Sequence, residues 1–183
     1  MNYQYYLLFN IILIFTIVKV YTKEYIIRNE EEDFINLRQL FPNFVGNELI
    51  LNFVDDYYNV PISKSRYEIT VASNITFRGN QNGTIMDYGY SRNYELGILH
   101  RYSNTYTVTF ENFIFQNYNE ELDRSGMELI RFISSNDNFY LKFINCTFLN
   151  NSYSVVRIEE TCPNSSHFDH SNPSVVFDNC YFL

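Results

Sequence analysis

The side chains best suited to chemistry in this chain include one pair of adjacent carboxylates, Asp55 and Asp56. Two carboxylates on either side of a glycosidic bond can act as general acid and general base. Neighbouring residues on an extended strand, however, point to opposite faces of a sheet. We therefore assign no catalytic role to this pair, and no catalytic residue elsewhere.

A second candidate is the spacing Cys-x4-His-x2-His formed by Cys162, His167 and His170. Thiolate and imidazole groups are the usual ligands of zinc. A structural zinc site needs a fourth ligand and normally contains paired cysteines, and only carboxylates lie nearby in the sequence. We interpret the segment as a polar loop and expect neither a metal nor another cofactor.

The elements that would have to position such groups form a repeat along the second half of the chain. Short strand-like segments recur at an almost constant spacing, each anchored by a phenylalanine: Phe77, Phe110, Phe143 and Phe177. Apolar and other residues alternate around each anchor, which is typical of a strand with one buried face. A fixed period of this size indicates a solenoid, in which each unit buries its apolar face against the next.

An asparagine follows each of the last three anchors, two positions further along the chain: Asn112, Asn145 and Asn179. Asparagine tolerates the left-handed backbone conformation, so these residues predict a corner between two strands. Equivalent positions of stacked coils lie about 4.8 Å apart. We therefore expect the asparagines to form one structural ladder, with the anchors buried and Thr109, Lys142 and Val176 facing solvent.

A third strand per coil is predicted from Glu95–Leu99 and Glu128–Phe132, which have the same separation as Phe110 and Phe143, and from 155–158. Three short strands, an asparagine corner and polar loops make one coil of a parallel β-helix.

The chain contains three cysteines, and Cys146 and Cys180 occupy the same position of adjacent coils. We expect these two to be stacked thiols and Cys162 to seek an external partner.

The stretch from Phe143 to Asn151 reads F-x-N-C-x-F-x-N-N. It resembles coils of the secreted right-handed parallel β-helix proteins in the pectate-lyase-like superfamily, and the resemblance covers residues 45 to 183. It implies an all-β, right-handed parallel β-helix. The superfamily contains polysaccharide lyases and glycoside hydrolases, but the Gly-His-Gly, Arg-x-Lys and calcium-binding motifs of its enzymes are not found in this sequence.

The chain divides into three parts. The apolar run at 7–18 has the length of a signal-peptide core, so we predict a secretory signal at 1–22, with an uncleaved membrane anchor as the alternative. Residues 23–47 predict a strand and a short capping helix, in which Phe34, Leu37, Leu40 and Phe41 recur at helical spacing. Residues 48–183 are the β-helix coils.

The last coil stops inside its motif at Leu183. From this we expect the chain to be the N-terminal portion of a longer β-helix, or to associate end to end through residues 175–183. Unpaired strand edges at the end of a solenoid template such association.

Two sets of surface residues carry the remaining expectations. The sequence contains five Asn-x-Ser/Thr sequons, which agree with secretion. Asn145 is expected to be a corner residue, so the glycosylation candidates are Asn74, Asn82, Asn150 and Asn164. Tyrosines around the second coil predict an aromatic surface for stacking on sugars or a protein partner: Tyr88, Tyr90, Tyr94, Tyr102 and Tyr106.

These observations favour a secreted, non-catalytic β-helix scaffold, or a surface protein that binds carbohydrate or another extracellular protein. The alternatives are a polysaccharide lyase or glycoside hydrolase, and an incomplete gene product without independent function. The formal net charge of −8 argues against nucleic acid as a partner. Membrane contact is expected only if residues 7–18 stay attached.

Overall fold

The computed structural model describes residues 22–30, 33, 37, 44, 48–60, 65–90, 94–101, 104–119, 128–135, 139–152, 154–160 and 174–183. All elements within these ranges are β-strands. The predicted signal lies outside them except for Thr22, and so does most of the predicted capping helix, although Leu37 is buried in the core. In this part of the chain, no helix is long and apolar enough to cross a membrane.

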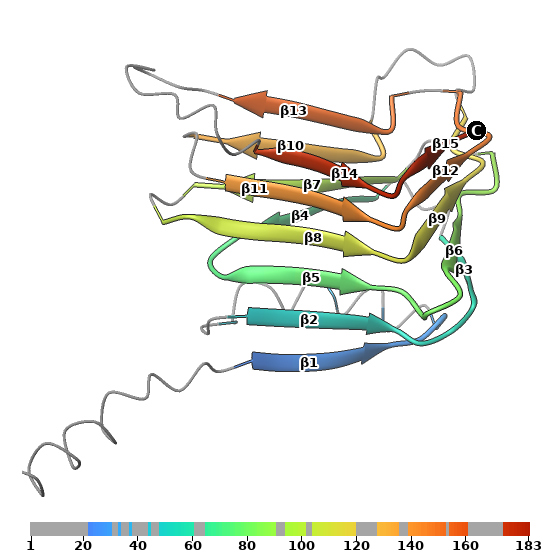
Figure 1. The fold of residues 1–183 in the computed structure, drawn as a ribbon, viewed down its shortest axis with the longest axis horizontal. Helices are drawn as coiled ribbons and strands as arrows, with labels where there is room; N and C mark the ends of the chain where they lie inside the picture. Colours follow the sequence, from blue (N-terminus) through green and yellow to red (C-terminus); the bar gives the residue numbers. More distant parts are fainter. Residues whose placement is uncertain are drawn as a thin grey trace, which may run out of the picture.

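Three parallel sheets form the walls of a solenoid (Figure 1). Sheet A contains, in spatial order, β1 (Thr22–Ile27), β2 (Glu48–Phe53), β5 (Asn74–Arg78), β8 (Tyr106–Glu111), β11 (Phe139–Ile144) and β14 (Val175–Asp178). Sheet B contains β3 (Tyr57–Asn59), β6 (Thr84–Asp87), β9 (Phe113–Gln116), β12 (Thr147–Leu149) and β15 (Tyr181–Phe182). Sheet C contains β4 (Ser65–Thr70), β7 (Tyr94–His100), β10 (Ile130–Ser134) and β13 (Val156–Glu160).

From β2 onward the chain visits the sheets in a fixed order, so that a coil such as β5–β6–β7 adds one strand to each sheet. Every strand pair is parallel, as between β5 and β8. The predicted all-β parallel solenoid is therefore confirmed.

The phenylalanine spacing predicts the register of sheet A correctly. Phe77 pairs with Phe110, Phe110 with Phe143, and Phe143 with Phe177. Their rings stack nearly parallel, with centroids 4.6, 5.2 and 4.8 Å apart. The prediction that all the anchors are buried is wrong for Phe177, which is 42% exposed because β14 is the edge strand of its sheet.

A second aromatic column lines sheet B and completes the core. The rings of Phe115, Phe148 and Phe182 stack with centroids 5.3 and 4.8 Å apart. The two columns meet edge to face, with Phe143 and Phe148 at 5.7 Å and 69°. Such edge-to-face pairs add to the stabilisation that area burial supplies.

The predicted register of sheet C is wrong by one position. Leu96 pairs with Ile130, whereas the phenylalanine period would pair it with Leu129. The predicted register would also place Arg131 opposite Ile98, which is buried in the core. A slip of one position reverses which face every side chain occupies, so burial of Ile130 and Phe132 selects the observed register.

Replacing Phe143 by Ala should lower the free energy of unfolding by about 3–5 kcal/mol, because it leaves a cavity between two stacked rings. Denaturant unfolding measures the change. Lys142→Ala, on the outward face of the same strand, is the matched control and should stay within about 0.5 kcal/mol of wild type. An F143A variant as stable as the control would contradict the stacked column.

Candidate functional site

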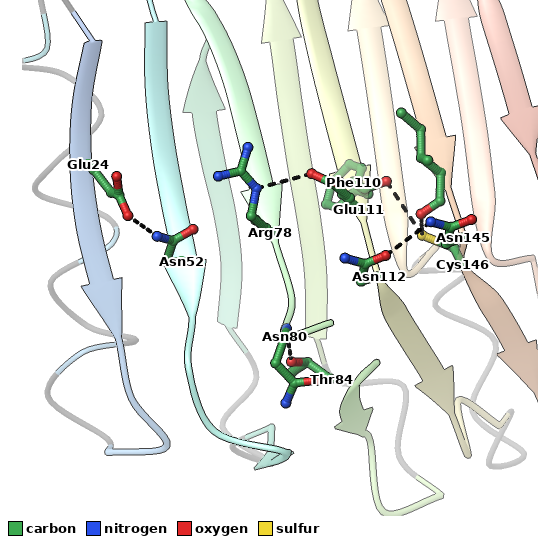
Figure 2. Close-up of polar contacts among 11 residues, drawn as sticks. Glu24, Asn52, Arg78, Asn80, Thr84, Phe110, Glu111, Asn112, Asn145 and Cys146 are labelled. Atoms are coloured by element: carbon green, nitrogen blue, oxygen red, sulfur yellow. Dashed lines mark hydrogen bonds and ion pairs between the residues drawn. The ribbon is translucent and has the colours of Figure 1, made fainter. Parts of the chain in front are cut away.

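The predicted corner asparagines lie together between sheets A and B. Asn112, Asn145 and Asn179 have φ angles of 61°, 52° and 52°, in the left-handed region. Nδ2 of Asn145 donates to Oδ1 of Asn112 at 3.2 Å (Figure 2). Nδ2 of Asn179 donates to Oδ1 of Asn145 at 2.8 Å. The amides thus form a continuous hydrogen-bonded ladder along the corner.

One coil below the ladder, a glycine takes the corner position. The Gly79 N–H donates to the Glu111 carbonyl oxygen at 2.8 Å, as Asn112 donates to Ile144 at 3.0 Å. A Cβ at Gly79 would lie 2.2 Å from the carbonyl oxygen of Asn112, so only glycine fits there.

The charged and polar side chains beside this corner are also paired between coils. Arg78 Nε contacts Glu111 Oε2 at 3.1 Å, and Asn52 Nδ2 donates to Glu24 (Figure 2). Each of these contacts joins one coil to the next. We therefore interpret this edge of the solenoid as structural.

The carboxylates considered first for catalysis hold turns in place. Asp55 Oδ2 accepts from the Asn29 N–H at 2.7 Å, and Asp56 Oδ1 accepts from Asn80 Nδ2 at 2.6 Å. Both residues lie in the turn between β2 and β3. Their contacts are with backbone and amide groups of neighbouring segments, which is a structural role.

The two described cysteines are free, and the equivalent coil positions place them one above the other. Cys146 is buried, and Cys180 is partly buried. Burial raises the pKa of the Cys146 thiol to about 12, so it stays protonated and unreactive at neutral pH. Cys162, His167 and His170 lie outside the described residues, within which no group of metal-binding side chains occurs.

The described tyrosines of the predicted aromatic surface differ in exposure. Tyr88 is buried and meets Tyr118 edge to face, whereas Tyr90 is 59% exposed. Tyr106 is partly buried beside His100. Only the backbone of Tyr94 is described, and Tyr102 lies outside the described residues.

A cluster centred on Asp87, which the sequence analysis missed, draws on three successive coils. Asp87 Oδ2 accepts from the Tyr57 hydroxyl at 3.0 Å and from Gln116 Nε2 at 2.8 Å. Its Oδ1 accepts from Asn117 Nδ2 at 3.0 Å and from the Gly89 N–H at 2.8 Å. These residues, with the adjacent Tyr90, are called the Asp87 cluster below.

The electrostatics of this cluster favour an ionised carboxylate. Partial burial by itself raises the pKa of Asp87, but the hydrogen bonds from Asn117, Gly89, Gln116 and Tyr57 outweigh it and hold the pKa below its usual value. The bond to Asp87 in turn raises the pKa of Tyr57. A carboxylate with a lowered pKa is a hydrogen-bond acceptor and a poor proton donor.

Sheet C carries a second missed cluster, the ionic network. Arg131 binds both carboxylate oxygens of Glu159, at 3.1 and 2.8 Å, and lies 4.0 Å from the buried Glu95. Arg157 contacts Glu159 and the buried Glu128, each at 2.9 Å. Hydrogen bonds to Glu159 raise the pKa of Arg131, and those to Glu128 raise the pKa of Arg157.

A histidine and a serine are paired inside the core. His100 Nε2 lies 3.1 Å from the Asn104 carbonyl oxygen, which can only accept, so Nε2 carries the proton and Nδ1 accepts from the Ser134 hydroxyl at 3.1 Å. Such a pair resembles an activated nucleophile. His100 and Ser134 are both 0% exposed, so a substrate cannot reach them in this conformation and the pair is structural.

The described sequon asparagines differ in what their side chains contact. Asn74, Asn82, Asn145 and Asn150 are all exposed, but only Asn145 has its Nδ2 engaged by another residue. Asn74 accepts from the Thr107 N–H at 2.9 Å through Oδ1. Asn164 lies outside the described residues.

Replacing Asn145 by Ala should destabilise the protein by about 2–3 kcal/mol, because it removes two ladder bonds and strains a left-handed backbone. Asn145→Gly is the matched variant, since glycine adopts φ near 52° without strain. We expect it to be about 1 kcal/mol more stable than N145A in denaturant unfolding. Equal stabilities would show that the backbone conformation carries no cost.

Because His100 is buried, we expect the protein to lose stability in mild acid. Burial lowers its pKa below the usual 6.5, so between these two values the unfolded chain binds a proton that the native protein does not. Stability should be greatest above pH 6.5 and fall as the pH decreases toward the native pKa.

Denaturant unfolding between pH 7.5 and pH 5.5 measures this slope. A His100→Asn variant should flatten it. The same slope in H100N and wild type would contradict the assignment.

Comparison with protein-family models, with curated proteins and with solved structures finds no match to this chain.

Proposed function

We propose that this chain is a secreted, non-catalytic, right-handed β-helix protein that binds carbohydrate on the outer face of sheet B. The observation that carries the proposal is the Asp87 cluster. It combines a carboxylate of lowered pKa with amide side chains and two exposed aromatic rings, Tyr57 at 45% and Tyr90 at 59%.

Sugar recognition needs both kinds of group that this cluster offers. Exposed aromatic rings present flat apolar area with a polar edge, which suits the C–H face of a sugar ring. Asp87 holds the amide nitrogens of Gln116 and Asn117, and the amide oxygens of these two residues can accept hydrogen bonds from sugar hydroxyl groups. Because Tyr57, Asp87 and Gln116 come from three coils, an elongated glycan lying along the solenoid axis would contact all of them.

The runner-up function is a polysaccharide-active enzyme of the pectate-lyase-like type. The observation in its favour is the ionic network, in which two buried carboxylates and two arginines come from three coils of sheet C. Both arginines form close ion pairs with Glu159, and Arg157 also pairs with Glu128. These contacts support a structural network more than a free catalytic acid or base.

Glycan-array binding, followed by calorimetric titration of the best ligand, tests the proposal. Tyr57→Ala and Tyr90→Ala should each raise Kd by about tenfold, which is about 1.4 kcal/mol. Tyr57→Phe keeps the ring and should lose less. Tyr140→Ala, on the outer side of sheet A, is the control and should bind like wild type.

The same glycans should be incubated with the protein and assayed for new reducing ends and for unsaturated products. We expect binding without turnover. Turnover that Glu95→Gln or Glu128→Gln abolishes would establish the enzyme instead. Binding that Y57A, Y90A and Y140A all leave unchanged would contradict the site.

A further inference from the structure

We propose that Asn74, Asn82 and Asn150 are N-glycosylation sites of the folded protein and that the Asn145 sequon is not. The inference rests on the proposed extracellular location. It depends on one geometric difference among four sequons, namely whether the side-chain Nδ2 is already used inside the solenoid.

Exposure alone does not separate these asparagines, because all four are exposed. The Asn145 amide, however, lies between two other amides of the corner ladder. Its Nδ2 donates to Asn112, and its Oδ1 accepts from Asn179. A sugar ring attached to that nitrogen would lie directly beside a contact of 3.2 Å between neighbouring coils and crowd it (Figure 2).

The other three sequons leave Nδ2 without a hydrogen-bond partner among the described residues. Asn82 lies in the turn between β5 and β6, where the Gly83 N–H donates to the Asn80 carbonyl oxygen at 3.1 Å. Asn74 begins β5 and uses only Oδ1, which glycosylation leaves in place. Asn150 follows β12 with φ 53° and bonds to Leu183 through its backbone N–H.

The modification is a group transfer from a polyprenyl-pyrophosphate-linked oligosaccharide. The asparagine Nδ2 attacks the anomeric carbon and loses one proton as the new N–C bond forms. The bond from the anomeric carbon to the phosphate oxygen breaks, and the polyprenyl pyrophosphate leaves. Nδ2 keeps one N–H, and Oδ1 keeps its ability to accept.

The corner ladder determines which glycosylated chains can fold, because glycosylation precedes folding in the secretory pathway. The transfer occurs on the chain before it folds, so each sequon is open to it at that stage. A chain modified at Asn145 keeps one N–H for the rung with Asn112, but the bulky sugar has to fit beside the amides of Asn112 and Asn179 in the two neighbouring coils. The folded, secreted population is therefore the one with Asn145 unmodified.

The test uses eukaryotic secretory expression and mass spectrometry of the secreted protein, with occupancy read at each asparagine. All variants carry Asn164→Gln, so that only the four described sequons remain. We expect glycans on Asn74, Asn82 and Asn150 and none on Asn145. Replacement of each of the first three by Gln should remove one glycan, and N145Q should remove none.

A second variant frees the Asn145 amide. Asn112→Gly removes the acceptor of Asn145 Nδ2 and keeps a residue that tolerates φ near 61°. Glycan should then appear on Asn145 in the secreted protein. Occupancy of Asn145 equal to that of the other three sites in the parent chain, or the absence of glycan from all four, would overturn the inference.

Two expression arms separate this inference from the proposed function. One arm uses the native chain, and the other replaces residues 1–22 with a strong cleavable signal peptide. Failure of the native chain to enter the secretory pathway contradicts the extracellular proposal. The second arm reports the glycosylation pattern in either case, so it tests the geometry of the sequons independently.

Discussion

The structure depends on parallel, in-register stacking of each coil on the next. Ring centroids in the main phenylalanine column are 4.6–5.2 Å apart, close to the spacing of about 4.8 Å between paired strands. A coil whose length changed by a single position within a strand would turn its apolar side chains outward. Length is therefore adjusted at corners and loops, where Asn112 and Asn145 adopt positive φ angles.

This stacking uses the two carboxylates, Asp55 and Asp56, that were candidates for catalysis in the sequence. Asp56 bonds to Asn80 of the next coil, and Arg78 to Glu111 of the one after that. Contacts of this kind satisfy side chains that would otherwise be open to a ligand. The Asp87 cluster differs, because exposed rings remain beside its paired carboxylate.

The parts of the fold that the sequence predicts well are those with a strict period. Phe77, Phe110 and Phe143 predict the register of sheet A because they recur at equal spacing and are all buried. The register of sheet C is mispredicted because the step from Leu96 to Ile130 is one position longer, and alternation alone does not separate the two spacings. Asp87 and Gln116 pair across a shorter step than the phenylalanine period, so that period could not bring them together.

Side chains that face the core of the solenoid must stack on one another, whereas side chains that face solvent are free to vary. A binding site is therefore expected among the side chains that face solvent. Inward positions repeat apolar side chains, and in places the same ring stacks on itself, as in Phe115 and Phe148. Outward side chains reach solvent and need not repeat one shape, so Asp87 can lie between Asn59 and Gln116 without disturbing the core. A carboxylate placed there accepts hydrogen bonds from neighbouring coils that lower its pKa, which makes it a poor proton donor and fixes the amide and tyrosine side chains around it. This arrangement supports the proposed binding role over a catalytic one.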